Sequence, residues 1–316
     1  MTPAVSLAVE RSSRARRARG PVLVPLRRGV WAPAGTDPTD ADLRIAAVAA
    51  QLPAHAVVGG WAAARLHEVT AGGRDPVFDG GPRWEERPIG RGRCARVLVC
   101  AARDSRLTHR PDVRVFRSPV PDGQRERVLG MTVASAVRSA FDMARLLPVT
   151  SGVIAVDRML ALRLMTIDDL ALLVAAPGRW QGRPAARRVL TLCDAGAESP
   201  QESVLRLLWV GAGLPRPRAN VEVLDRDGRF VARVDLLDPD AGVVAEYDGG
   251  YHSGSDRRSR DAARQETLER LGLVVVRATS VDLEDGGARA WQMRLRAAYG
   301  RAARRPGDER RWVIGP

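Results

Sequence analysis

The 316-residue sequence contains no lysine. All 50 of its basic side chains are arginine, and against 37 acidic residues they leave a formal net charge of +13. Codon bias in a genome rich in G and C replaces lysine by arginine, but arginine also suits a polyanionic partner, because its planar guanidinium pairs with phosphate. The net charge does not depend on which basic residue is used, so nucleic acid is the leading class of partner. Aromatic residues make up only 4%, which disfavours recognition of single strands by base stacking.

Cysteine is also scarce. Cys94, Cys100 and Cys193 are odd in number and form no CxxC pair, which argues against a disulfide framework or a zinc site and suits a reducing cytoplasm. No apolar run reaches about 18 residues, and the arginine-rich start lacks the apolar stretch of a secretory signal. We therefore expect a cytoplasmic protein with no membrane partner.

The length predicts about two domains. We expect a disordered basic tail at 1–20, a mainly helical first domain with a few strands at 21–194, a second domain at 195–305 and a short tail at 306–316. In the first domain, Thr132 is in position to cap a helix that runs to Leu147. The other elements expected there are a hairpin at 22–32, helices at 40–52, 59–66, 151–162 and 166–174, and strands at 95–101 and 113–117.

The second domain follows the order helix, three strands, helix, strand, helix, which predicts a layered α/β fold. Ser199, Pro200 and Glu202 form a helix start, with serine at the N-cap and glutamate three positions later. The expected strands cover 221–225, 229–237, 243–249 and 273–279, and the later helices cover 256–271 and 287–304.

A symmetrical hairpin in this domain brings carboxylates together. Its turn is centred between Asp240 and Ala241, and Asp235 and Glu246 lie at equal distances from that centre. Asp248 lies two residues beyond Glu246, so in a strand it projects from the same face. We therefore expect three carboxylates on one patch of a sheet.

Such a cluster needs an offsetting positive charge or a shared proton. Two unit charges about 4 Å apart repel by roughly 4 kcal/mol at an effective dielectric of 20. Oxygen-only ligation with open positions suits Mg²⁺ or Mn²⁺, and a metal-bound water can hydrolyse a phosphodiester. The alternatives are that the carboxylates lie at strand ends in solvent, or that they pair with Arg233 and Arg277.

Residues 196–285 resemble the DUF559 family, which is related to the very-short-patch-repair endonucleases of the PD-(D/E)XK superfamily. The segments that carry the resemblance are SPQESVLRLLWVGAGLPRPRANVEV, VARVDLL, VVAEYDGGYH and RRSRDAARQETLERLGLVVVRAT. The resemblance implies a restriction-endonuclease-like, four-stranded mixed sheet flanked by helices. It also implies the following places for individual residues: Glu202 in the first helix, Asp235 as the central metal ligand, Glu246 with Asp248 as the (D/E)xK pair, His252 just beyond that strand, Asp261 in the following helix and Arg277 in the last strand.

The sequence departs from the superfamily pattern at its third motif position. Asp248 stands where lysine is usual, and no lysine elsewhere can take over its water-positioning role. His252 is the best substitute general base, although a histidine after two glycines also fits an exposed loop. Glu202 is explained either by helix capping or by a catalytic role. The arginines expected to contact DNA, or else to form a solvated helix face, are Arg257, Arg258, Arg260 and Arg264, with Arg277 as an internal partner of the carboxylates.

The first domain resembles, more weakly, the AbiEi-like proteins that often precede DUF559 domains. The matching segments are PLRRGVWA, VVGGWAAARLH, VRVFRSPVP and GMTVASAVRSAFDMARLLP. In that family a winged helix before the RRGV strand binds DNA, but here only a charged tail precedes it. The resemblance supports a scaffold or targeting domain, and a purely structural partner domain is an equal alternative.

Three functions compete on this evidence. The first is a Mg²⁺-dependent DNA endonuclease or nickase in defence or repair, with a toxin or another defence protein as a further partner. The second is a non-enzymatic, antitoxin-like DNA-binding regulator that carries a degenerate nuclease fold. The third is a basic surface that binds RNA or a protein.

Overall fold

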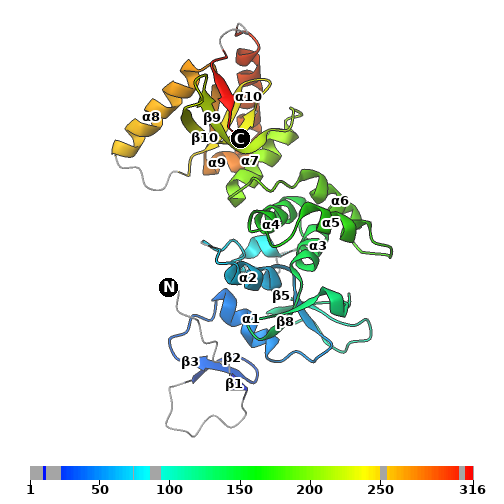
Figure 1. Ribbon diagram of the computed structural model, residues 1–316. Coiled ribbons are helices and arrows are strands. Elements are labelled where there is room, and N and C mark those ends of the chain that lie inside the picture. Colours follow the sequence, from blue (N-terminus) through cyan, green and yellow to red (C-terminus); the bar gives the residue numbers. More distant parts are fainter. Residues whose placement is uncertain are drawn as a thin grey trace. The chain divides into compact units, whose positions relative to one another are not determined.

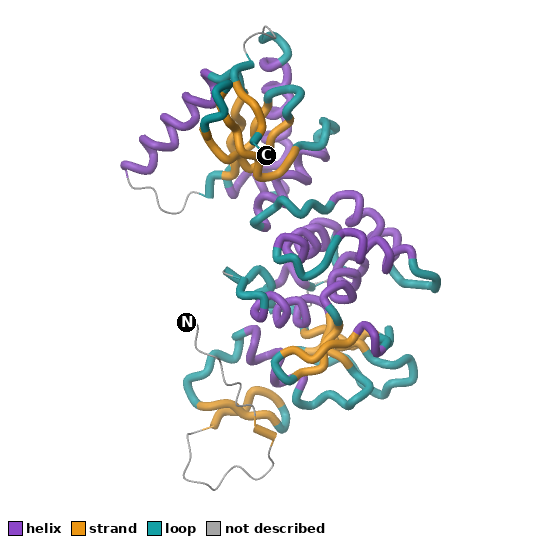
Figure 2. The backbone as a smooth tube through the Cα atoms, viewed as in Figure 1, coloured by secondary structure: helices purple, strands orange, loops and turns teal. Residues whose placement is uncertain are grey.

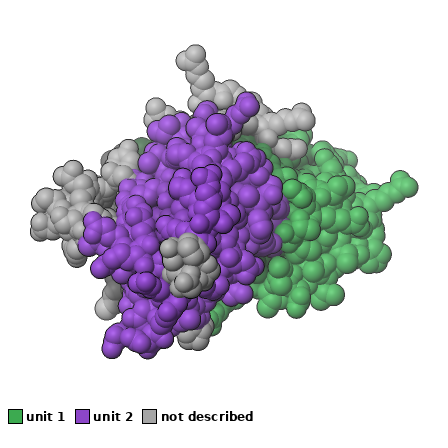
Figure 3. All heavy atoms as spheres, turned by 90° about the horizontal axis from the view of Figure 1, so that it is seen from above, with its two compact units in different colours: residues 1–191 green, residues 192–316 purple. Residues whose placement is uncertain are grey.

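The computed structural model describes residues 10–11, 23–73, 75–85, 94–249, 255–305 and 310–315. The chain divides into two compact units, Met1–Thr191 and Leu192–Pro316, which Figure 3 distinguishes by colour. The prediction of a mixed α/β protein is confirmed, since both units combine helices with a five-stranded mixed sheet (Figures 1 and 2). None of the described helices is long and apolar enough to cross a lipid bilayer.

The first unit contains two sheets. A three-stranded antiparallel sheet has the order β1-β3-β2, and a five-stranded mixed sheet has the order β6-β5-β4-β8-β7. The strands are β1 Glu10–Arg11, β2 Leu23–Arg27, β3 Val30–Pro33, β4 Val57–Gly59, β5 Val97–Cys100, β6 Val113–Phe116, β7 Arg125–Val128 and β8 Met131–Ala134. The helices are α1 Ala41–Ala49, α2 Gly60–Thr70, α3 Ala136–Leu146, α4 Val149–Ala161, α5 Ile167–Ala175 and α6 Arg183–Leu192, with 3₁₀ turns at Pro82–Trp84 and Asp122–Gln124.

The prediction that Thr132 caps a helix is wrong. Thr132 lies in β8, which pairs with β7 across a tight turn where Leu129 and Gly130 both have positive φ, the geometry of a type I′ hairpin. The cap of α3 is Ser135, whose hydroxyl accepts from the Arg138 amide at 3.3 Å. The first domain was expected to be mainly helical with a few strands, and the described residues of the first unit form six α-helices and eight strands.

A buried ionic cluster holds the core of the first unit. Asp142 is fully buried and accepts from Arg138 Nε at 3.0 Å and from Arg145 Nη2 at 2.6 Å. Both arginines also donate to the Ser118 hydroxyl. The Cys100 thiol lies 3.6 Å from Asp142, and burial raises the pKa of that thiol well above its usual range. Removing one member would leave an uncompensated charge inside the protein.

The second unit has one five-stranded sheet of order β12-β11-β10-β9-β13, in which β11 and β12 are parallel and the other neighbours antiparallel. This corrects the expected four-stranded sheet, because β13 forms within the segment assigned to a tail and pairs with β9. The strands are β9 Arg218–Asp225, β10 Phe230–Asp238, β11 Val243–Tyr247, β12 Val274–Ala278 and β13 Trp312–Ile314. The helices are α7 Pro200–Gly211, α8 Ser255–Arg270, α9 Ser280–Leu283 and α10 Asp285–Ala302.

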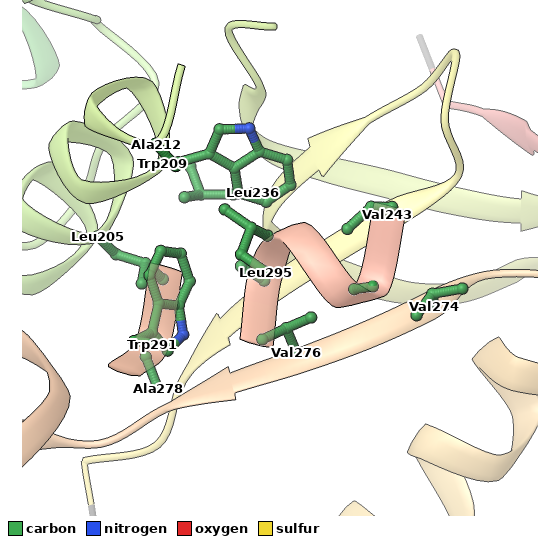
Figure 4. Close-up of a cluster of buried hydrophobic side chains, with 12 residues drawn as sticks. Leu205, Trp209, Ala212, Leu236, Val243, Val274, Val276, Ala278, Trp291 and Leu295 are labelled. Atoms are coloured by element: carbon green, nitrogen blue, oxygen red, sulfur yellow. The ribbon is translucent and has the colours of Figure 1, made fainter. Parts of the chain in front are cut away.

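Helices cover both faces of this sheet. On one face, Trp209 of α7 and Trp291 of α10 pack on Leu236, Val243 and Val276, all buried (Figure 4). On the other face, strand residues pack around Leu268 of α8 and Trp312 of β13. Full burial of each large side chain contributes about 1.5–3 kcal/mol, so the two layers fix the sheet from both sides.

Candidate active site

The turn between β10 and β11 sets the register of the site. Asp238 accepts hydrogen bonds from the amides of Asp240 and Ala241 at 2.9 and 3.1 Å, and Tyr299 of α10 donates to it at 2.6 Å. The ladder then pairs Leu236 with Ala245, so the next opposed positions are Asp235 and Glu246. The register predicted from the sequence is confirmed by this pairing.

At Asp235, strand β10 changes which side of the sheet its alternate side chains point to, and β9 does the same at Asn220. Val234 packs in the cluster around α8, whereas Leu236, two residues later, packs in the cluster with α7 and α10. On β9, Val221 and Ala219 divide between the two clusters in the same way, and Asn220 between them has a left-handed φ of 52°. The kink leaves Asp235 half-buried, and its Oδ2 accepts from the Tyr247 amide at 2.7 Å.

Glu246 is the more deeply placed of the two carboxylates, with 8% of its surface exposed. Arg264 of α8 donates to Glu246 through Nη2 at 2.6 Å and Nη1 at 3.4 Å. The same Nη2 lies 2.6 Å from the Arg233 carbonyl oxygen, which ties the helix to β10. Arg264 is therefore the cation that forms an ion pair with Glu246.

The electrostatics of this pair is unfavourable to two full negative charges. Burial raises the pKa of Asp235, and the charge of Glu202 raises it further, against the Tyr247 amide and Arg264. Burial likewise raises the pKa of Glu246; Arg264 opposes this and the charge of Asp235 adds to it. A carboxylate pair whose ionised forms are both disfavoured is a place where an added cation is stabilising.

Glu202 combines helix capping with a position beside Asp235. The Ser199 hydroxyl accepts from the Glu202 amide at 3.2 Å, as expected for an N-cap. The Glu202 carboxylate, however, accepts from the Glu198 amide at 2.8 Å and from Asn220 Nδ2 at 2.5 Å. These two contacts hold the side chain where its charge acts on Asp235. The position of Glu202 is therefore compatible with both predicted roles, in the helix start and beside the carboxylate pair.

Asp248 does not join the pair as expected. It is exposed, and its Oδ2 lies 3.5 Å from Arg277 Nη1, while its amide donates to the Ala278 carbonyl at 2.7 Å. Arg277 pairs with Glu246 across the parallel β11–β12 ladder, and its charge lowers the pKa of Glu246. Among the described residues, no three Asp, Glu, His or Cys side chains converge closely enough to hold a metal ion. The expectation of three converging carboxylates is thus reduced to Asp235 and Glu246, with Glu202 nearby.

Several predicted residues lie outside the described part of the site. His252, predicted as a general base, lies outside the described residues. Arg257, Arg258, Arg260 and Asp261 lie in α8, but their side chains are outside the description. Arg264 is described, and it contacts Glu246.

Two residues of this site were not anticipated from the sequence. Asn220 bridges the Gly196 carbonyl and Glu202, and Glu198 pairs with Arg233 across 35 positions. An asparagine in a strand is a signal for positive φ, which makes Asn220 recognisable in retrospect. The partner of Arg233 depends on the turn after α6, for which the local sequence carries no signal.

Comparison with known proteins gives limited similarity. No family model matches the chain, and no solved structure matches it. Two uncharacterized proteins, MT2308 and Rv2248, from two strains of Mycobacterium tuberculosis, are each 29% identical over 174 residues. The match covers 55% of this chain, and it spans 64% of the length of each relative. Neither name states an activity.

Proposed function

We propose that the second unit is a metal-dependent DNA endonuclease or nickase of the restriction-endonuclease-like type, acting in defence or repair. The observation that carries the proposal is the Asp235–Glu246 pair. Burial raises the pKa of both carboxyls, the charge of Glu202 adds to this at Asp235, and the charge of Asp235 adds to it at Glu246. Perturbed pairs of this kind concentrate at functional sites. The sheet order and the helix on each face support the DUF559 resemblance, and the surplus of arginine supports a polyanionic substrate.

Asp235 and Glu246 are the residues that would hold Mg²⁺ or Mn²⁺. Both offer carboxylate oxygen, which these ions prefer, and water would complete the coordination. The bound ion would supply an acidic water as nucleophile and neutralise charge on the phosphodiester. Glu202, held by Asn220, adds negative charge at Asp235 and so favours a cation there. Arg264 and the ion would both contact the Glu246 carboxylate. N–H groups of Arg264 that no longer donate to Glu246 would then donate to a phosphate oxygen.

Plasmid cleavage tests this proposal. Purified protein is incubated with supercoiled plasmid in Mg²⁺ or in Mn²⁺, and nicked and linear forms are counted over time. Asp235→Asn and Glu246→Gln should each abolish nicking, because each removes a charged ligand and keeps the shape of the side chain. Asp227→Asn, in the exposed turn between β9 and β10, should nick like the wild type. Equal nicking by all four proteins would place the activity elsewhere, and nicking by none would remove the proposal.

A second function, a non-enzymatic DNA-binding regulator with a degenerate nuclease fold, is favoured by one observation. Glu246 already has a cationic partner in Arg264, and Asp248 stands at the lysine position of the motif. This alternative expects DNA binding that is unchanged by EDTA and a melting temperature that is unchanged by Mg²⁺. The alternative is rejected if EDTA weakens DNA binding by the wild type, or if Mg²⁺ raises the melting temperature of the wild type, and Glu246→Gln lacks that response.

A further inference from the structure

The first unit contains a cleft with an aliphatic floor and an arginine rim. Its volume is about 810 Å³, within the range of small-ligand sites. The floor is formed by Val48 and Leu52 at the end of α1 and by strand residues including Val99, Val113 and Val115. The rim carries the exposed side chains of Arg28, Arg106 and Arg110, and the largely buried Arg27 also lines the cleft. Three of the elements that enclose it, α1, β2 and β5, are labelled in Figure 1.

The walls of the cleft are held in place by hydrogen bonds. On one side, Gln51 Nε2 donates to the Arg28 carbonyl at 2.6 Å, which fixes the turn between β2 and β3. On the other side, Arg117 Nη2 donates to the Leu107 carbonyl at 3.2 Å, and Arg110 and Val113 exchange main-chain hydrogen bonds. The loop that carries Arg106 and Arg110 is therefore shaped before any ligand arrives.

The positive charges of the cleft are only partly balanced by the described acidic side chains. Arg27 Nη1 lies 3.2 Å from Asp112, but burial and the charge of Arg110 both lower the pKa of Arg27. In the part of the chain that the structure describes, no acidic side chain pairs with Arg28, Arg106 or Arg110. Like charges that repel across a shaped cleft are stabilised by an anion placed between them.

We propose that this cleft binds a nucleoside phosphate, either as a free nucleotide or as the phosphorylated end of a nucleic-acid strand. The arginine rim receives the phosphate, and the aliphatic floor receives the sugar and the base. A bare inorganic anion would use the rim and leave the floor uncovered, whereas a nucleotide covers both. The proposal concerns the first unit, so it does not rest on the nuclease assignment of the second.

The test uses the whole 316-residue chain carrying Asp235→Asn, in EDTA, so that cleavage cannot contribute. Calorimetry measures binding of ATP, AMP and inorganic phosphate. Fluorescence anisotropy compares a labelled single-stranded 12-mer bearing a 5′-phosphate with the same strand bearing a 5′-hydroxyl. Tighter binding of a nucleotide than of phosphate identifies the free form, and tighter binding of the phosphorylated strand identifies the strand end.

Variants of the rim assign this binding to the cleft. Because a charge-assisted hydrogen bond contributes more than a neutral one, the double variant Arg106→Ala/Arg110→Ala should weaken binding by at least about tenfold. Arg103→Ala, an exposed arginine of the same loop outside the cleft lining, should change it less than about twofold. Equal binding by the double variant and the Arg103→Ala control overturns the proposal. So does an absence of any measurable binding, or equal affinity for both 12-mers with no binding of a nucleotide.

Discussion

Replacing Asp235 by asparagine should stabilise the protein without metal and remove its response to metal. The substitution keeps an oxygen that can accept from the Tyr247 amide, now at 2.7 Å, so the local hydrogen bond is retained. It removes a charge that opposes ionisation of Glu246. An exchange of stability for function of this kind is expected at a binding site and not at a structural ion pair.

The magnitude follows from the arrangement of the charges. As an upper limit, two unit charges about 4 Å apart at an effective dielectric of 20 repel by roughly 4 kcal/mol. Because Asp235 is only half-buried and Arg264 screens Glu246, we expect the substitution to add up to about 2 kcal/mol to the free energy of unfolding. Wild-type protein should gain about 1.4 kcal/mol from about 10 mM Mg²⁺ if the dissociation constant is about 1 mM. For a unit of this size, that is a rise of about 4 °C in the melting temperature.

The pH dependence carries the sign of the effect. The pKa of each carboxyl is raised in the folded state, so the folded protein binds more protons than the unfolded chain, and stability falls as the pH rises through the raised pKa. The advantage of Asp235→Asn should therefore be small near pH 4 and largest near pH 8, where both carboxyls of the wild type are ionised.

Scanning calorimetry with and without Mg²⁺, at both pH values, measures these differences. A crossed pattern is expected: the variant melts higher than the wild type in EDTA, and Mg²⁺ raises the melting temperature of the wild type alone. If Asp235→Asn lowers stability in EDTA, or if Mg²⁺ shifts both proteins equally, the pair is not a metal site held at a cost in stability.

Three further predictions concern neighbouring features. Arg264→Gln should lower the free energy of unfolding by about 1–3 kcal/mol at pH 8 and less at pH 4, below the raised pKa of Glu246, in urea titrations with Arg270→Gln on the same helix as the control. Equal losses at both pH values would contradict the pairing. Asn220→Gly should fold normally and Asn220→Val should lose about 1–2 kcal/mol, because valine resists the left-handed φ of 52°; equal stability in calorimetry would contradict the strained backbone. Asp142→Asn should lower the free energy of unfolding by about 3–5 kcal/mol. Asp122→Asn, whose side chain is 96% exposed, should lower it by less than about 0.5 kcal/mol. Equal midpoints in urea would show that the buried cluster contributes little.

The carboxylate hairpin was predictable because its information is local. The positions of Asp235 and Glu246 about one turn fix their pairing, and the observed ladder follows that register. Capping at Ser199 was readable for the same reason, since the signal lies within four residues. The three-carboxylate cluster was not, because the direction of Asp248 depends on Arg277 from a strand that is distant in sequence.

Non-local pairing accounts for the larger errors. β13 joins β9 although Val313 and Leu224 are 89 positions apart, and nothing within the segment WVI distinguishes an edge strand from an apolar tail. Thr132 fits a helix cap as well as a strand, and only its pairing with Arg127 decides between them. The kink at Asn220 likewise arises from two strands that divide their side chains between two cores.

Each unit contains one buried cysteine, so the rate at which that thiol is alkylated reports how often the unit opens. Cys100 is buried in the first unit and Cys193 in the second, whereas Cys94 is partly accessible. Alkylating reagents attack the thiolate, so the two buried thiols react only when the structure around them opens. The rates at which iodoacetamide labels Cys100 and Cys193, read by peptide mass spectrometry with Cys94 as the internal standard, would report the opening of each unit separately. One native sample would thus show whether Mg²⁺ protects the second unit alone.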